Sequence, residues 1–117
     1  MASIIDPTLA KSLITEFRNQ NKSAAEHALK TPEGQDFHGF FINRESLESI
    51  LSDPKVVGIS LHHAKHPDFV GKKENVYTTV MVGAVPNTTP NAATPYVSSG
   101  DYFDNMPICP PYCTSLS

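Results

Sequence analysis

Two runs of β-branched and aliphatic residues, joined by a polar segment, constrain this chain of 117 residues more than any other feature. The first run begins at Val56, the second covers residues 76–85, and the segment between them contains Gly71-Lys72-Lys73-Glu74-Asn75. β-Branched residues favour strands, and a glycine-containing polar link between two such runs predicts an antiparallel hairpin. Because a lone hairpin is at best marginally stable in water, we expect other segments of the chain to cover it.

The alternation of side chains differs between the two runs. In the first, Val57, Ile59 and Leu61 alternate with glycine and serine, so only one face of that strand is apolar. In residues 76–85 both alternating sets are partly apolar. A strand of this kind is expected in the middle of a sheet, or with helices on one face and a tail or a partner subunit on the other.

Upstream of the hairpin, the sequence predicts a helix that begins at Asp6-Pro7, because the Asp side chain can cap it and proline suits the first helical position. The apolar residues that follow at helical spacing are expected to face a core, and they are Leu9, Leu13, Ile14 and Phe17. This stripe weakens afterwards, so a break or a second short helix is expected near Asn21.

The next predicted elements are a short strand at 38–42 and a short helix at 44–52 with Asn43 as its N-cap. We therefore predict an α+β fold with an N-terminal helix, a short strand, a short helix, an antiparallel β-hairpin and a Pro-rich C-terminal tail packed on the sheet or on a partner. Residues 1–85 would form a single domain, and residues 86–117 would form the tail.

Residues 86–117 contain six of the ten prolines, a composition that by itself favours a loop. Aromatic and apolar side chains could nevertheless anchor this tail to the sheet or to a neighbouring molecule. The residues expected to form this interaction surface are Tyr77, Met81, Tyr96, Tyr102, Phe103, Ile108 and Tyr112.

Charge and hydropathy exclude two classes of partner. Nine Lys plus Arg against twelve Asp plus Glu give a net charge of −3, so there is no basic field to attract nucleic acid. No apolar stretch approaches membrane-spanning length, and the N-terminus does not resemble a secretory signal. We expect a cytoplasmic protein without a membrane or nucleic-acid partner.

Imidazole and thiolate groups are good zinc ligands, and the candidates here are His62, His63, His66, Cys109 and Cys113. If the first hairpin strand continues through His63, the adjacent His62 and His63 point to opposite faces and cannot share one ion. Either could join His66 only if the chain turns at Ala64. The alternative is that all three histidines are simply solvated at the strand end and that no cofactor is bound.

The two cysteines are separated by three residues, of which two are consecutive prolines. This is not the two-residue spacing of thioredoxin-like redox motifs. Consecutive prolines favour an extended rise that keeps the cysteine side chains apart, and a cytoplasmic location disfavours a disulfide. We therefore expect Cys109 and Cys113 to have a packing or docking role, with redox or metal chemistry as the alternative.

The sequence evidence for acid–base catalysis is weaker than the evidence for a metal site. Asp36 and His38 would share a face in a strand, but no nucleophile elbow or phosphate loop lies near them in the sequence. Asp101, Asp104 and the segment Ser98-Ser99-Gly100 also lack the flanking pattern of a hydrolase. A small enzyme or ligand-binding protein built around His38 is a third hypothesis.

Four segments occur in a recognisable order, FFINRESLESIL, VVGISLHHAKH, VYTTVMVGAV and a terminal Cys-Pro-Pro-Tyr-Cys. Over roughly residues 40–113 this order resembles a group of small cytosolic proteins of Bacteroidetes-type bacteria. In that group a short helix precedes a VGI strand, a VLVG-like strand follows, and the chain closes near a Cys-Pro-Pro motif. The resemblance implies a bacterial protein with a shared fold and brings no activity with it, and the Thr-, Asn- and Pro-rich insert before Tyr102 departs from the pattern.

The predicted function is that of a small non-enzymatic interaction or assembly protein, which self-associates through its sheet and its aromatic-rich tail or binds another protein there. The alternative is a metal-binding or redox module that uses the three clustered histidines and the two cysteines.

Overall fold

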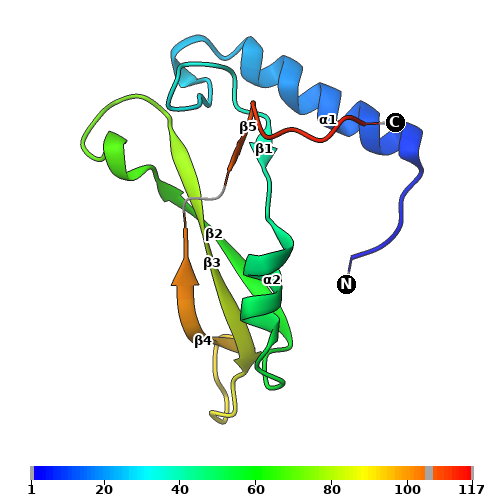
Figure 1. Ribbon diagram of the computed structural model, residues 1–117, viewed down its shortest axis with the longest axis vertical. Helices are drawn as coiled ribbons and strands as arrows, with labels where there is room; N and C mark the ends of the chain where they lie inside the picture. The colour runs from blue at the N-terminus through cyan, green and yellow to red at the C-terminus, as the bar shows by residue number, and fades with distance from the viewer. Residues whose placement is uncertain (1, 105–106, 117) are drawn as a thin grey trace.

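The predicted hairpin lies at the centre of the computed structural model, which describes residues 2–104 and 107–116 (Figure 1). Strands β2 (Gly58–Lys65) and β3 (Tyr77–Pro86) pair antiparallel, with Gly58 opposite Ala84 and Lys65 opposite Tyr77. The connection between them contains the short 3-10 helix η2 (Pro67–Phe69). The structure confirms the α+β class and the antiparallel hairpin.

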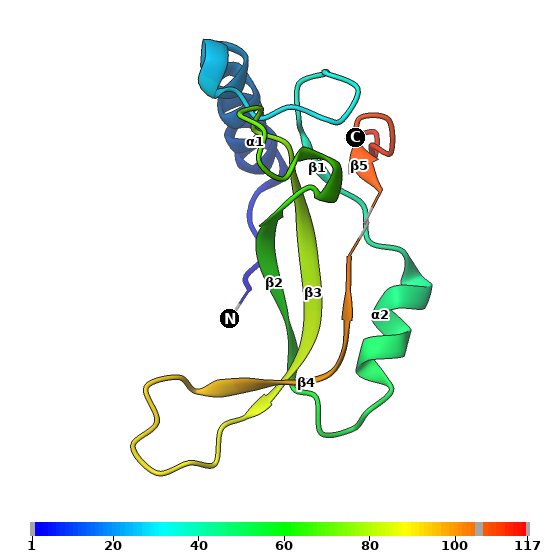
Figure 2. The ribbon, with the colours of Figure 1, turned by 90° about the vertical axis from the view of Figure 1, so that its left-hand side faces the viewer.

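Strand β4 (Tyr96–Phe103) adds to the free edge of β3, so the strand order is β2-β3-β4 and β3 lies in the middle. The pairing shifts abruptly, because Val82 lies opposite Tyr102 while Gly83 lies opposite Ser99. This irregularity bends β4 sharply, as Figure 2 shows. Part of the proline-rich tail therefore enters the sheet as an edge strand, which the composition of the tail did not predict.

Helix α2 (Arg44–Leu51) covers one side of this sheet (Figure 2). The Asn43 side chain caps it, since its Oδ1 accepts a hydrogen bond of 2.8 Å from the Ser46 backbone N–H. The helix agrees with the predicted 44–52 within one residue. The core forms between this helix and the sheet, where Ile50 and the fully buried Met81 are surrounded by Phe40, Ile42, Leu47, Val56, Ile59 and Phe103.

Helix α1 (Pro7–Lys22) lies across one end of the molecule (Figure 1). It begins as predicted, with the Asp6 carboxylate accepting from the Leu9 N–H, and it is followed by a separate 3-10 helix, η1 (Ala25–His27). The predicted break near Asn21 is therefore confirmed. The prediction that its apolar stripe faces the core is wrong for three of its four residues, because the exposed fractions of Leu9, Leu13 and Phe17 are 48%, 55% and 40%.

The buried Asn21 ties the end of α1 to the rest of the chain. Its Nδ2 donates to the carbonyl oxygens of Leu29 and Phe37 over 2.9 and 3.4 Å, and its Oδ1 accepts from the Leu29 N–H over 2.6 Å. Leu29 and Phe37 are half-buried and lie outside helices and strands, and the side-chain amide provides the hydrogen bonds that regular secondary structure would otherwise supply. The segment that leads to His38 is therefore held against the end of α1.

A second, two-stranded sheet joins distant parts of the chain. Strand β1 (Gly39–Phe40) pairs antiparallel with β5 (Ile108–Cys109), with Gly39 opposite Cys109. The strand is shorter than the predicted 38–42, but hydrogen bonds of 2.9 Å from His38 N–H to Cys109 O and from Phe41 N–H to Pro107 O extend the pairing at both ends. Among residues 2–104 and 107–116, no helix has the length and apolar character needed to cross a membrane.

The close packing of α2 on the sheet depends on the absence of a side chain at Gly83. A Cβ atom there would lie 3.1 Å from Val56 Cγ2, 3.2 Å from Ile50 Cγ2 and 3.2 Å from the Ser99 carbonyl oxygen. We expect Gly83→Ala to lower the free energy of unfolding by about 1–3 kcal/mol, because the core must shift to accept it.

Urea unfolding followed by circular dichroism measures this effect. Gly58→Ala on the neighbouring strand is the matched control, because nothing lies within 4 Å of its added Cβ, and we expect it to change stability by no more than about 0.5 kcal/mol. Equal stability of the two variants would contradict this account of the packing.

Candidate functional site

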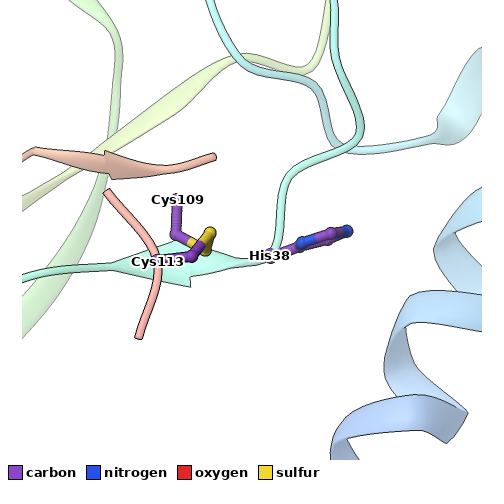
Figure 3. A group of neighbouring side chains, drawn as sticks. All are labelled: His38, Cys109 and Cys113. Carbon is purple, nitrogen blue, oxygen red and sulfur yellow. A yellow bond between two sulfur atoms is a disulfide. The ribbon is translucent and has the colours of Figure 1, made fainter. Parts of the chain in front are cut away.

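The pairing of β1 with β5 brings His38, Cys109 and Cys113 together, and we call these residues the His38–cysteine site. One ligand atom from each residue, a ring nitrogen of His38 and the two sulfur atoms, lies within 4.8 Å of the others. Figure 3 shows the two cysteines next to His38, with the imidazole ring directed away from the sulfur atoms. Cys109 is buried, His38 is half-buried and Cys113 is exposed.

Cys109 and Cys113 form a disulfide, with their Cα atoms 4.8 Å apart. The expectation that the two prolines hold the cysteine side chains apart is therefore wrong. The residues between them form a turn, which is closed by hydrogen bonds from Tyr112 N–H to Ile108 O over 3.1 Å and from Cys113 N–H to Pro111 O over 2.8 Å. This turn reverses the chain where an extended rise was expected.

The structure places the three predicted histidine ligands elsewhere. His62 and His63 lie on β2, opposite Val80 and Thr79, so their side chains point to opposite faces of the sheet as expected. His66 lies beyond the end of β2, where its Nδ1 accepts from the Asp68 N–H and its ring packs edge-on against Phe69. In the described part of the chain, none of the three joins the cysteines.

The prediction that these histidines share a site with the cysteines is therefore wrong. Strand β5, which carries Cys109, pairs with β1 and not with β2, which carries His62 and His63. No local sequence signal pairs His38 with the cysteines. Only the pairing of strands that are distant in sequence brings them together.

The electrostatic surroundings of His38 favour a neutral imidazole. Burial lowers the pKa of His38, the positive charge of Arg18 lowers it further, and Asp36 acts in the opposite direction. Asp36 is engaged elsewhere, since its carboxylate lies 2.6 Å from Lys30 Nζ, and this hydrogen bond lowers the pKa of Asp36. The predicted Asp36–His38 pair therefore does not form a simple acid–base dyad.

The seven residues predicted to form an interaction surface divide into two groups. Met81 is fully buried and Phe103 packs against it, so both belong to the core, while Ile108 is half-buried on β5. Tyr77, Tyr96, Tyr102 and Tyr112 expose between 37% and 64% of their surface. The tyrosines are therefore accessible, whereas the apolar members of the set hold the chain's own core together.

Two of the hollows in the structure lie beside predicted histidines. A largely apolar cavity of about 240 Å³ opens between Leu29, Phe37, Phe40 and Tyr77, with His63 at its wall. A groove of about 250 Å³ separates His66 from the cysteine turn and is lined by Pro110, Pro111 and Tyr112. Both are smaller than the usual range of about 300–1,000 Å³ for ligand pockets.

No family model, no curated protein and no solved structure matches this chain. The resemblance to small proteins of Bacteroidetes-type bacteria and the predicted function therefore stay predictions.

The disulfide closes a very short loop, with a sequence separation of 4. Chain-entropy arguments give such a loop a stabilising effect of about 2 kcal/mol. We expect reduction in the presence of a chelator to lower the free energy of unfolding by that amount, as measured by urea unfolding.

The variant carrying both Cys109→Ser and Cys113→Ser serves as the control, and its stability should not respond to the reductant. If reduction left the wild-type curve unchanged, the disulfide would not hold the end of the chain in place.

Proposed function

We propose that this chain is a non-enzymatic assembly protein that functions as a dimer of identical copies, paired through the exposed side of α1. The observation that carries this proposal is an excess of surface. The chain exposes 8660 Å², whereas a folded monomer of 117 residues exposes about 6,300 Å². Its radius of gyration is 16.6 Å, against roughly 13 Å for a compact domain of this length.

The excess of about 2,400 Å² per chain leaves ample surface for a partner, since a standard protein–protein interface buries about 800 Å² per partner. A contact between two α1 helices would use only part of this surface. The core is correspondingly small, since only seven apolar residues among those described are buried. A small domain with so little buried apolar surface gains much of its stability from a partner.

Helix α1 supplies the surface for this contact. Leu9, Leu13 and Phe17 follow one another at intervals of four residues, so they form one line along the helix. The chain's own contacts are on the adjacent flank, where Ile14 is half-buried and Asn21 is buried. Only one flank of a wide apolar stripe is therefore covered by this chain, and the other flank faces solvent.

The spacing of these residues suits pairing with a second copy. If two α1 helices pack antiparallel about a two-fold axis at Leu13, Leu9 of each copy lies opposite Phe17 of the other, and the two Leu13 side chains meet. Such a self-complementary contact closes after two copies. The charged residue that borders the stripe is Glu16. Its carboxylate already accepts a hydrogen bond of 3.2 Å from the side chain of Gln20 on the same helix.

The Leu13→Glu variant tests this proposal, because it places a charge at the centre of the exposed stripe. We expect the wild-type chain to sediment as a dimer and the variant to dissociate roughly 100-fold more readily, a loss of about 2.7 kcal/mol. Sedimentation equilibrium over a range of protein concentrations measures both dissociation constants.

Thr15→Glu is the matched control, since it introduces the same charge on the opposite, exposed side of the same helix. We expect it to leave the dimer intact. A wild-type chain that stays monomeric at millimolar concentration would overturn the proposal, and so would equal weakening by both variants.

A further inference from the structure

The His38–cysteine site contains donor atoms that are typical of a metal centre, but its two sulfur atoms are joined to each other in a disulfide. Zinc sites use thiolate and imidazole ligands, and the three intervening residues between Cys109 and Cys113 fall within the two to four that are usual between paired cysteine ligands. The sulfur atoms of a disulfide are not thiolates, so they cannot serve as these ligands while the bond exists. Disulfide and metal centre are therefore mutually exclusive states of one site.

We propose that reduction of the Cys109–Cys113 disulfide opens a zinc site formed by the two cysteine sulfurs and one ring nitrogen of His38. A dithiol reductant supplies two electrons and two protons by thiol–disulfide exchange. The S–S bond breaks, the protein gains two thiols, and the reductant becomes a disulfide. Zinc then displaces the two thiol protons, which pass to solvent, and the metal binds two thiolates and the neutral imidazole.

Zinc binding would require the sulfur atoms to separate and the His38 ring to turn towards them. In a tetrahedral site with Zn–S distances of about 2.3 Å and Zn–N distances of about 2.0 Å, neighbouring ligand atoms lie roughly 3.5–3.8 Å apart. The three ligand atoms already lie within 4.8 Å of one another. Once the S–S bond is broken the sulfur atoms can separate, and rotation of the half-buried His38 side chain directs a nitrogen towards them (Figure 3).

Backbone hydrogen bonds place the three ligands next to one another. The hydrogen bond of 2.9 Å from His38 N–H to Cys109 O joins the histidine to the first cysteine. The second cysteine is tied to the first by the turn that Tyr112 N–H closes on Ile108 O. Because Cys113 is exposed, both a reductant and a metal ion can reach the site.

Charge balance also favours zinc. Two thiolates neutralise the dication, so metal binding adds no net positive charge next to Arg18, whose charge acts on His38. Within residues 2–104 and 107–116 no fourth cysteine, histidine or carboxylate joins the group.

The test uses the full chain and the metal ion alone. The protein is reduced with a phosphine, which takes an oxygen atom from water and becomes a phosphine oxide, and it is then freed of reductant under argon. Titration with Zn²⁺ against a chromogenic chelator measures stoichiometry and affinity, and Co²⁺ reports thiolate ligation through its charge-transfer absorption. We expect one ion per reduced chain and none per oxidised chain.

Two histidine variants identify the third ligand. His38→Gln should weaken binding by at least about tenfold, whereas His66→Gln, which alters a histidine across the groove from the cysteine turn, should bind as the wild type does. His38→Cys retains a ligand atom and should also retain binding, which shows that loss in the Gln variant does not come from misfolding.

Bound zinc should protect both thiols from alkylation. This protection gives a second readout that does not depend on the chelator. The proposal is overturned if the reduced chain binds no zinc, or if His38→Gln binds as tightly as the wild type. Because none of the three ligands belongs to α1, Leu13→Glu should still bind zinc when reduced, so this proposal and the proposed dimer can fail separately.

Discussion

Burial of β3 on both of its faces is the constraint on which the rest of this structure depends. Met81 and Val82 are neighbours whose side chains point to opposite sides of the sheet, and their exposed fractions are 0% and 1%. A strand of this kind needs a neighbour at each edge and a cover over its faces. Strand β2 from the hairpin and β4 from the tail supply the two edges, and α2 covers the face that carries Met81.

Because α2 and the sheet form the core, helix α1 contributes little to it. Among the described residues, the core cluster between the sheet and α2 contains no side chain of α1, and the buried Asn21 of α1 instead forms hydrogen bonds with the backbone of Leu29 and Phe37. Hydrogen bonds fix the end of a helix in place but bury little apolar area. The exposed line of Leu9, Leu13 and Phe17 is the direct result, and it contributes to the large surface of this chain.

Elements with local signals could be predicted from the sequence, whereas the pairing of distant segments could not. Asp6 and Asn43 cap the helices where expected, because a cap acts within three residues. Strand β4 escaped prediction because its residues favour a loop by composition and become a strand only against the edge of β3. His38 and the cysteines meet for the same reason, through the pairing of β1 with β5.

The pairing of β1 with β5 is too short to hold the end of the chain through hydrogen bonds alone. Two residues on each strand contribute a ladder of marginal stability, and the turn beyond it is largely exposed. Small domains commonly compensate for a limited core with a covalent or metal cross-link. The disulfide provides such a cross-link between the two cysteines, and the proposed zinc ion would join the same two cysteines to His38, the residue before β1. The metal-bound form would therefore tie β5 to the start of β1, whereas the disulfide only closes the turn that follows β5.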